Sequence, residues 1–220
     1  MIKRVIFDID NTLIPWKEKY YNEINNVLDS LNINYTQEDY NKIKEAFNEY
    51  ENEYYTFDKK LMLQYINKYT KKEYPEEFIY GCINNWADCV PKKLDKSIIN
   101  MLEYLQNKYQ MVILTDWYAD QQIEKLKKIN IIKYFSKVYS AEKVKRKPFK
   151  EAFLQAIGDN KPEECIMIGD DFERDIKGAL DVGLKAVYYN PKNKVVNDEN
   201  REYYTIFKLD ELIKLLWYVK

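Results

Sequence analysis

The stretch VIFDIDNTL, residues 5–13, decides the fold, because an apolar run ends there in two carboxylates. Residues 2–7 are rich in β-branched and aromatic side chains, a composition typical of a buried parallel strand. Asp8 and Asp10 follow at its carboxyl end, where open α/β sheets bind ligands. On an extended chain the two carboxylates point to the same side, about 6–7 Å apart. Such a pair can divide the roles of nucleophile and acid/base catalyst.

A simpler interpretation of the same stretch involves no chemistry. Asp8 and Asp10 would be turn formers after a strand, and Thr12 would cap a helix. The choice between the two interpretations depends on residues further along the chain.

The composition is that of a globular protein with a sizeable core, since 46% of the 220 residues are hydrophobic. The 35 basic and 36 acidic residues leave a net charge of -1, so no overall field attracts nucleic acid or an anionic membrane. No apolar segment approaches the ~20 residues of a membrane span, and no signal-peptide pattern precedes the first strand. We therefore expect a cytoplasmic monomer or weak homodimer that binds neither nucleic acid nor membranes.

Histidine and cysteine counts narrow the possible chemistry. Histidine is absent, which excludes Ser-His-Asp and Cys-His hydrolysis, His-ligated zinc and phosphohistidine chemistry. Cys82, Cys89 and Cys165 lack metal-ligand spacing and are expected to be buried thiols. Carboxylates and lysines must therefore carry any catalysis.

Hydrophobic periodicity divides the chain into two kinds of structure. Residues 15–90 predict four successive amphipathic helices, with a capping box at Thr36 and Asp39 and with Pro75 in the first turn of the fourth. From residue 91 onward helices alternate with short apolar strands, which predicts an α/β fold with a doubly wound parallel sheet. We expect residues 1–14 and 91–220 to form this core domain, and residues 15–90 to be a helical domain inserted after the first strand.

Polar residues follow three further predicted strands. The strand at 111–114 ends at Thr115, which offers a hydroxyl. Lys147 follows the strand near 138–139, and Pro148 is expected to open the next helix and aim Lys147 inward, while the neighbouring basic residues stay solvated. The strand at 165–168 ends in Gly169-Asp170, Asp175 comes five residues later, and a helix is predicted to begin at Ile176. Carboxylates at these strand ends suit Mg²⁺, a cation that prefers oxygen ligands.

In this order the motifs resemble those of the haloacid dehalogenase-like hydrolase superfamily. Residues 8–12 look like its first motif, Thr115 like its second and Lys147-Pro148 like its third, and Gly169-Asp170 with Asp175 looks like its fourth. The helical insert resembles the type 1 cap of the family, whose core is Rossmann-like. The surroundings of Asn11, which stands where Gly is commoner, are similar to members that act on nucleoside monophosphates.

The resemblance implies a two-step mechanism. Asp8 would attack phosphorus to form an aspartyl phosphate, and Asp10 would protonate the leaving alcohol and later accept a proton from water. Thr115 and Lys147 would hold the transferring oxygens.

The resemblance also implies a Mg²⁺ site. Asp8, Asp170 and the main-chain carbonyl of Asp10 would bind the metal, and Asp175 would orient a water on it or Lys147. A carboxylic acid at Asp10 favours phosphate esters over carbon–halogen bonds, because a leaving halide needs no proton. Phosphonate cleavage would want a different residue at this position.

We therefore predict a Mg²⁺-dependent phosphatase of a small phosphorylated metabolite. A nucleoside monophosphate is the first choice of substrate, and sugar or organic-acid phosphates are alternatives. Contacts to the leaving group are expected from Trp16, Lys17, Lys19 and Tyr20, whereas the other aromatic residues of 15–90 are expected in the core of the insert. Two other functions fit the same motifs: a phosphomutase that returns the phosphoryl group to a sugar, and a phosphate-binding regulatory protein without turnover.

Overall fold

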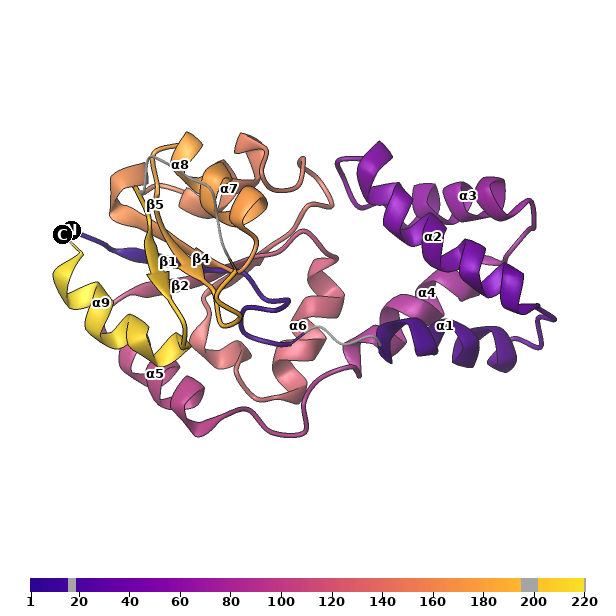
Figure 1. Cartoon of the computed structure of the whole chain (residues 1–220), viewed down its shortest axis with the longest axis horizontal. Coiled ribbons are helices and arrows are strands. Elements are labelled where there is room, and N and C mark those ends of the chain that lie inside the picture. Colours follow the sequence, from indigo (N-terminus) through magenta and orange to yellow (C-terminus); the bar gives the residue numbers. More distant parts are fainter. Residues whose placement is uncertain (16–18, 195–201, 220) are drawn as a thin grey trace.

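A computed structural model describes residues 1–15, 19–194 and 202–219, which form a parallel sheet and a bundle of helices (Figure 1). Within these ranges the sheet has six strands in the order β3-β2-β1-β4-β5-β6, all parallel. The strands are β1 (Arg4–Phe7), β2 (Gln110–Leu114), β3 (Lys137–Tyr139), β4 (Cys165–Gly169), β5 (Lys185–Tyr189) and β6 (Tyr204–Ile206). The strand order runs in opposite directions from β1, which confirms the predicted doubly wound sheet.

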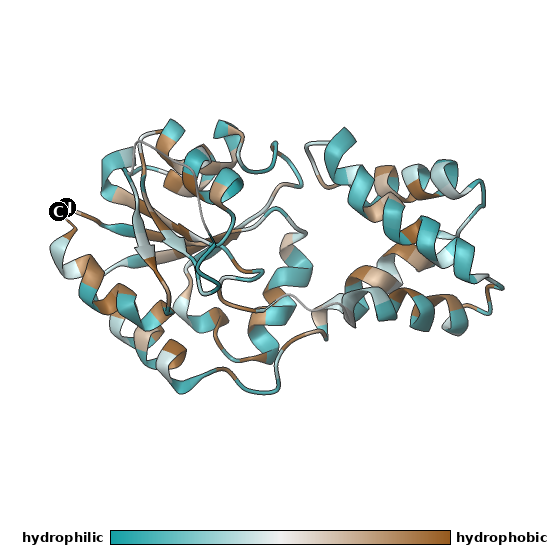
Figure 2. Cartoon of the chain, in the orientation of Figure 1, coloured by the Kyte–Doolittle hydropathy of each residue, from teal (hydrophilic) through white to brown (hydrophobic). Residues whose placement is uncertain are grey.

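Helices cover both faces of this sheet, because its side chains alternate between two apolar layers. Val5 and Phe7 of β1 pack in one layer, and Ile6 packs in the other. The first layer contains side chains of α5 (Lys96–Gln106) and α9 (Leu212–Tyr218), and the second contains those of α7 (Lys150–Ile157) and α8 (Gly178–Asp181). Figure 2 shows the resulting hydrophobic interior around the strands. Burial on both faces explains the continuous apolar runs in the sequence.

Four helices follow β1 and form a bundle beside the sheet (Figure 1). They are α1 (Lys19–Ser30), α2 (Gln37–Glu53), α3 (Lys59–Thr70) and α4 (Glu76–Ala87). Their apolar faces meet in a cluster of their own, which also takes in Tyr118 and Ala141 from the sheet side. Tyr118 caps α6 (Ala119–Lys128), the helix of the sheet region that α4 contacts.

Local signals set most of the helix ends. Thr36 accepts a hydrogen bond from the backbone N–H of Asp39, and the Asp39 carboxylate accepts one from the backbone N–H of Thr36, so the predicted capping box is confirmed. Pro75 is the N-cap of α4, one residue before the first turn in which it was predicted. All three cysteines are buried free thiols, as predicted.

Two predicted helix starts are wrong. Pro148 does not open α7, which begins at Lys150 with Phe149 as its extended N-cap, because the chain must first turn away from Lys147. The helix after β4 was predicted from Ile176, but a π-helix already spans Phe172–Lys177 and runs into α8. Asp171 starts it early, since its carboxylate accepts from two backbone N–H groups of the first turn. Among the helices in the described part of the chain, none has the length and apolar composition to cross a membrane.

Candidate active site

The carboxyl ends of the central strands bring the predicted polar residues together. Phe7 at the end of β1 is in register with Ile113 of β2 and with Ile168 of β4. The residues that follow these strands, Asp8, Thr115 and Asp170, therefore emerge side by side at one edge of the sheet. Lys147 and Asp175 reach the same edge from loop and helix positions.

Asp8, Lys147 and Asp175 form a buried ionic triad. The Lys147 Nζ donates to Asp8 Oδ1 at 2.8 Å and to Asp175 Oδ1 at 2.6 Å. Each of the three residues is at most 7% exposed. Removing Lys147 would leave two buried carboxylates without their counter-ion, so the three residues form one unit.

Lys147 points inward, as predicted, and most of its basic neighbours do not. Its backbone N–H donates to Asp116 Oδ1 at 2.8 Å, which fixes the loop before α7. Lys143, Lys145 and Lys150 are exposed, as predicted, but Arg146 is half-buried and its Nη2 donates to the Glu51 carbonyl at 2.7 Å. The same basic stretch therefore places a single lysine in the interior.

Glycine at the end of β4 makes room for Asp175. A Cβ atom at Gly169 would collide with the Asp175 carboxylate, so a side chain there would displace it. The other oxygen of Asp175, Oδ2, accepts from the backbone N–H of Asp171 at 3.1 Å. Asp175 is thus held from two sides while it binds Lys147.

Asp8, Asp170 and Asp175 are suited to hold a divalent cation. One carboxylate oxygen of each lies within 4.8 Å of the others. Burial raises the pKa of Asp8 to about 7, against the opposing effect of Lys147, and raises the pKa of Asp170 to about 6. Lys147 forms ion pairs with two of these carboxylates, and Lys194 acts on Asp170 from further away, so the three carboxylates outnumber the paired lysine. A hard cation binds oxygen ligands, and a cluster with more carboxylates than positive charges offers such ligands.

Lys147 keeps its own charge in this setting. Burial opposes the ammonium form, but the surrounding carboxylates, Asp175 most of all, raise the pKa of Lys147 well above its ordinary value of 10.5. The sheet edge therefore holds a fixed positive charge beside the Asp8 carboxylate.

Asp10 has two partners that the sequence reasoning missed. Lys125 Nζ donates to Asp10 Oδ1 at 2.8 Å, and Gln122 Nε2 donates to Asp10 Oδ2 at 2.6 Å. Both donors lie on α6 and are buried. The sequence did contain a signal for these partners. Gln122 and Lys125 are three residues apart in the helix that follows Thr115, and both lie close to the apolar Leu126 on the helix surface.

Thr115 lies where its hydroxyl proton can reach a ligand. The residue is 2% exposed, and its Oγ1 accepts from Gln122 Nε2 at 3.1 Å and from the Trp117 backbone N–H at 3.2 Å. A hydroxyl has two acceptor sites and one donor. With both acceptor sites in use, the O–H of Thr115 is the group left for a bound oxygen.

Thr12 does not cap a helix, so this part of the simpler interpretation of the first motif is wrong. Residues 9–14 form a tight turn in which the backbone N–H groups of Thr12, Leu13 and Ile14 all donate to the Ile9 carbonyl. Asn11 has a φ of 63°, the left-handed region that asparagine tolerates better than most residues. Asparagine thus fills a turn position that also suits glycine.

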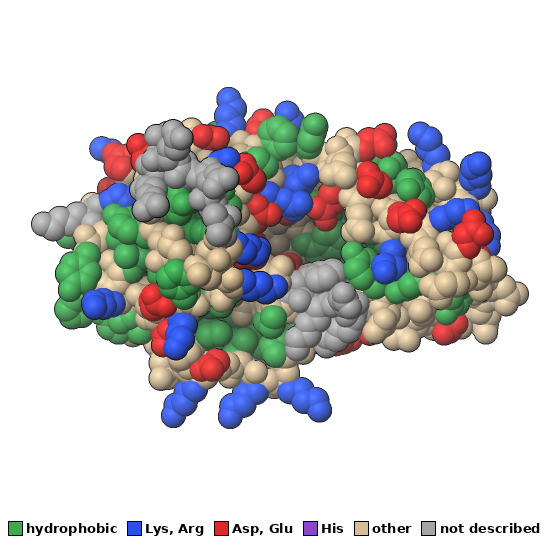
Figure 3. Space-filling view, viewed as in Figure 1, with side chains coloured by type: hydrophobic (Ala, Val, Ile, Leu, Met, Phe, Trp, Pro, Cys, Tyr) green, Lys and Arg blue, Asp and Glu red, His purple; other side chains and the backbone are tan. Residues whose placement is uncertain are grey.

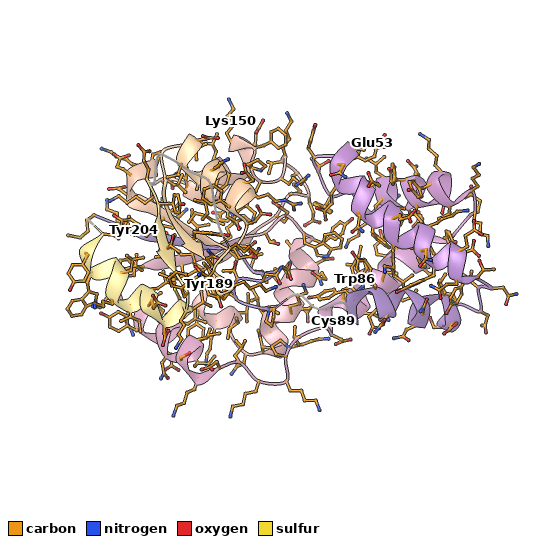
Figure 4. The ribbon with its side chains drawn as sticks, viewed as in Figure 1. Glu53, Trp86, Cys89, Lys150, Tyr189 and Tyr204 are labelled. Carbon is orange, nitrogen blue, oxygen red and sulfur yellow. The ribbon has the colours of Figure 1, made fainter. Side chains whose placement is uncertain are left out.

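A cavity of about 850 Å³ opens between this sheet edge and the helical bundle. Figure 3 shows the hollow, with acidic and basic side chains at its rim. Its wall contains the charged residues described above and aromatic side chains from both parts of the molecule, among them Tyr20, Phe47, Phe57, Trp86 and Trp117. Trp86 lies on the side of the bundle that faces the sheet (Figure 4).

These aromatic residues belong to the packed interior and to the cavity wall at once. Trp117 contacts Phe57 and Trp86 at ring-centroid distances of 4.9 and 5.4 Å. Tyr20 lines the cavity, and its contact with the leaving group stays a prediction. The other predicted leaving-group contacts are not placed, since Trp16 and Lys17 lie outside the described residues and the Lys19 side chain is also not described.

Polar contacts join the bundle to the sheet region around the cavity. Arg174 of the π-helix pairs with Glu51 of α2 at 3.1 Å, and Lys59 of α3 pairs with Asp120 of α6 at 2.7 Å. The Phe57 N–H also donates to the Ala141 carbonyl at 3.1 Å. The cavity is therefore bounded by both parts of the molecule.

Comparison with known proteins places this architecture. The family model described as haloacid dehalogenase-like hydrolase matches residues 5–189. The chain belongs to this family. It is 26% identical to glyceraldehyde 3-phosphate phosphatase of Pyrococcus furiosus, over 98% of this chain and 93% of that protein. It is 25% identical to pyrimidine 5'-nucleotidase PynA of Streptococcus pneumoniae, over 51% of this chain and 49% of that protein.

The solved structures agree on the fold of this haloacid dehalogenase-like hydrolase. The HAD-hydrolase YfnB of Bacillus subtilis, in a crystal structure bound to magnesium, superposes with a TM-score of 0.74 at 20% identity, covering 98% of each chain. The predicted superfamily and fold class are thereby confirmed.

Proposed function

We propose that this hydrolase is a Mg²⁺-dependent phosphatase of small phosphate monoesters. The observation that carries the proposal is the buried arrangement of Asp8, Lys147 and Asp175 in the wall of the cavity. It supplies a carboxylate nucleophile beside a permanent positive charge, which is what attack on an anionic phosphoryl group requires. One relative named as a phosphatase and another named as a 5'-nucleotidase support this choice over carbon–halogen cleavage.

In the first step an oxygen of Asp8 bonds to phosphorus as the ester P–O bond breaks. Asp10 gives its proton to the departing alcohol oxygen. In the second step a water oxygen bonds to phosphorus and the bond to Asp8 breaks, while Asp10 takes the proton of that water. Phosphate leaves, and Asp8 and Asp10 are restored.

Lys147 and Thr115 hold the phosphoryl oxygens during both steps. Lys147 offers its ammonium protons and Thr115 its hydroxyl proton, and both lie on the sheet edge beside Asp8. Asp175 acts through Lys147, whose ammonium it fixes at 2.6 Å. A pre-placed donor needs no reorganisation when charge develops on the transferring group.

Asp8 and Asp170, with the main-chain carbonyl of Asp10, would hold Mg²⁺, and Asp175 would support the site. The excess of carboxylates over lysine in this cluster fits a divalent cation. When bound, the metal would supply positive charge that lets the anionic ester approach Asp8. The relation to YfnB, a relative crystallised with magnesium, supports this choice of ion.

We propose residues 15–90 as the cap that selects the leaving group, and a nucleoside monophosphate as the substrate. The support is the aromatic part of the cavity wall, where Tyr20, Trp86 and Trp117 supply apolar surface to a planar base. A triose phosphate is the second candidate, because the relative that matches over almost the whole chain is a glyceraldehyde 3-phosphate phosphatase.

The test is phosphate release with Mg²⁺ from nucleoside 5'-monophosphates, glyceraldehyde 3-phosphate and hexose phosphates. We expect the highest kcat/KM for a nucleoside monophosphate. Turnover confined to glyceraldehyde 3-phosphate would reassign the substrate without changing the chemistry. Isomerised hexose phosphate without free phosphate would identify a mutase instead. Absence of turnover with every ester would favour a phosphate-binding regulatory protein.

A further inference from the structure

Two donors from a single helix occupy the Asp10 carboxylate. Lys125 Nζ lies 2.8 Å from Oδ1 and Gln122 Nε2 lies 2.6 Å from Oδ2. The Asp10 side chain is 27% exposed, whereas that of Lys125 is 1% exposed. Asp10 therefore meets the cavity with one side and α6 with the other.

Lys125 has little reason to be buried other than this contact. A buried ammonium needs an opposite charge and hydrogen-bond acceptors. Asp10 supplies both, and it is the ion-pair partner of Lys125 within the described residues. The Lys125 Nζ also lies 4.7 Å from the ring centroid of Tyr20, in the first turn of α1.

Gln122 links Asp10 to the phosphoryl end of the site. Its Nε2 donates to Asp10 at 2.6 Å and to Thr115 Oγ1 at 3.1 Å. One amide thus fixes the carboxylate relative to the hydroxyl that follows β2. The contact with Thr115 is buried and the contact with Asp10 is partly buried, and a hydrogen bond shielded from water in this way orients its partner strongly.

We infer that Lys125 and Gln122 are positioning residues that aim Asp10 at the oxygen of the leaving group. The inference rests on the proposed phosphatase function. Each carboxylate oxygen has two acceptor sites. The two donors take one site on each oxygen and fix the plane of the carboxylate, so that a remaining site faces the cavity and can carry the proton. Without them Asp10 would rotate about its side-chain torsions and would meet the ester oxygen less often.

A structural role for the same ion pair predicts something different. If Lys125 only ties α6 to the turn after β1, its loss disturbs the whole sheet edge, and every ester is affected alike. If Lys125 aims Asp10, its loss affects only those esters whose leaving group needs a proton. Uridine 5'-monophosphate and glyceraldehyde 3-phosphate release an alcohol, whereas p-nitrophenyl phosphate releases a phenolate that leaves without a proton.

The experiment compares kcat/KM for these esters in Lys125→Met, Gln122→Met and the control Lys127→Met. Lys127 lies on the same helix, and its side chain is 55% exposed. The ratio kcat/KM covers steps up to departure of the leaving group, so the later water attack does not enter it. Melting curves by circular dichroism show whether each variant is folded.

We expect Lys125→Met to lower kcat/KM for the alkyl esters about 100-fold, within the range of general acid catalysis, and for p-nitrophenyl phosphate less than about fivefold. Gln122→Met should also lower kcat/KM for the alkyl esters more than kcat/KM for p-nitrophenyl phosphate, by a smaller factor than Lys125→Met. If Lys125→Met does not fold, the result for Gln122→Met decides the question. Equal losses for both kinds of ester, or no loss for either, overturn the inference. A wild-type protein without activity on any of them overturns the proposed function itself, and the inference with it.

Discussion

Asp8 at the sheet edge and Asp39 in the helical bundle are equally covered, each 7% exposed, yet their environments act on them in opposite directions. Burial deep in the sheet region raises the pKa of Asp8 to about 7. Hydrogen bonds from Lys72 and Thr36 near the surface of the bundle lower the pKa of Asp39 to about 2. The same residue type thus carries a destabilised charge in one region and a stabilised charge in the other.

The difference shows what each region is built to do. The Asp39 charge contributes to stability, because three donors converge on it: the Thr36 backbone N–H, the Thr36 hydroxyl and the Lys72 ammonium. The Asp8 charge shares a single lysine with Asp175 and lies near Asp170. Such an excess of charge is unfavourable for folding and is typical of a site that binds and transforms a ligand.

The largest expected effect is the loss of activity when Asp8 is replaced. Asp8→Asn removes the nucleophile at nearly constant shape, and we expect kcat to fall by a factor on the order of 10³ or more, which corresponds to about 4 kcal/mol of barrier. The melting temperature in chelator at pH 8 should stay equal or rise, because one of three crowded carboxylates has lost its charge. Steady-state phosphate release and thermal unfolding measure the two effects. Activity within about tenfold of wild type would contradict the role of Asp8; the exposed Asp159→Asn is the control.

An intermediate effect is expected from the cation itself. Mg²⁺ at 100 times its Kd stabilises a protein by about 2.7 kcal/mol, which for a chain of this size raises the melting temperature by roughly 5–10 °C. Asp170→Asn should remove most of this shift, since it removes one of the three clustered carboxylates. Asp171→Asn should retain the full shift in melting temperature, because an asparagine at this position next to Asp170 can still cap the π-helix. A shift of full size in Asp170→Asn would show that the metal binds elsewhere.

The smallest effect is expected in the bundle and depends on pH. Asp39→Asn should lower stability by about 1 kcal/mol near neutral pH, the scale of a helix cap. Since the folded pKa of Asp39, about 2, lies below its ordinary value of 3.8, this stability is present above pH 4 and is lost as the pH falls through 2. Melting curves from pH 7 to pH 2 should therefore converge for wild type and variant, while kcat at pH 7 is unchanged. Glu38→Gln in the same helical turn, with a side chain 75% exposed, should show no such difference.

Local chemistry made some residues predictable. The capping box needs only the spacing of Thr36 and Asp39, because both partners lie in one helical turn. The strand ends were also predictable, since a buried parallel strand ending in polar residues leaves few alternatives for Asp8, Thr115 and Asp170. The position of Lys147 before a proline indicated correctly that it points inward, although the helix itself begins only at Lys150.

Other features depend on contacts that no local pattern encodes. Lys125 and Asp10 are 115 residues apart, and their meeting depends on how far α6 is rotated about its axis when Leu126 packs in the core. A rotation by one residue would direct Lys125 to solvent. The double use of Trp86 and Trp117, in the bundle core and in the cavity wall, likewise follows from how the bundle rests against the sheet.

The sequence by itself determined the parallel sheet, the helical insertion and the set of carboxylate, hydroxyl and lysine groups at the strand ends, because these depend on periodicity and on which residues terminate a strand. Only the tertiary structure decided how their charges are balanced. Three carboxylates meet one lysine at Asp8, and Asp10 is held by Lys125 and Gln122 of α6, because burial and distance, rather than residue type, set the energy of a charge.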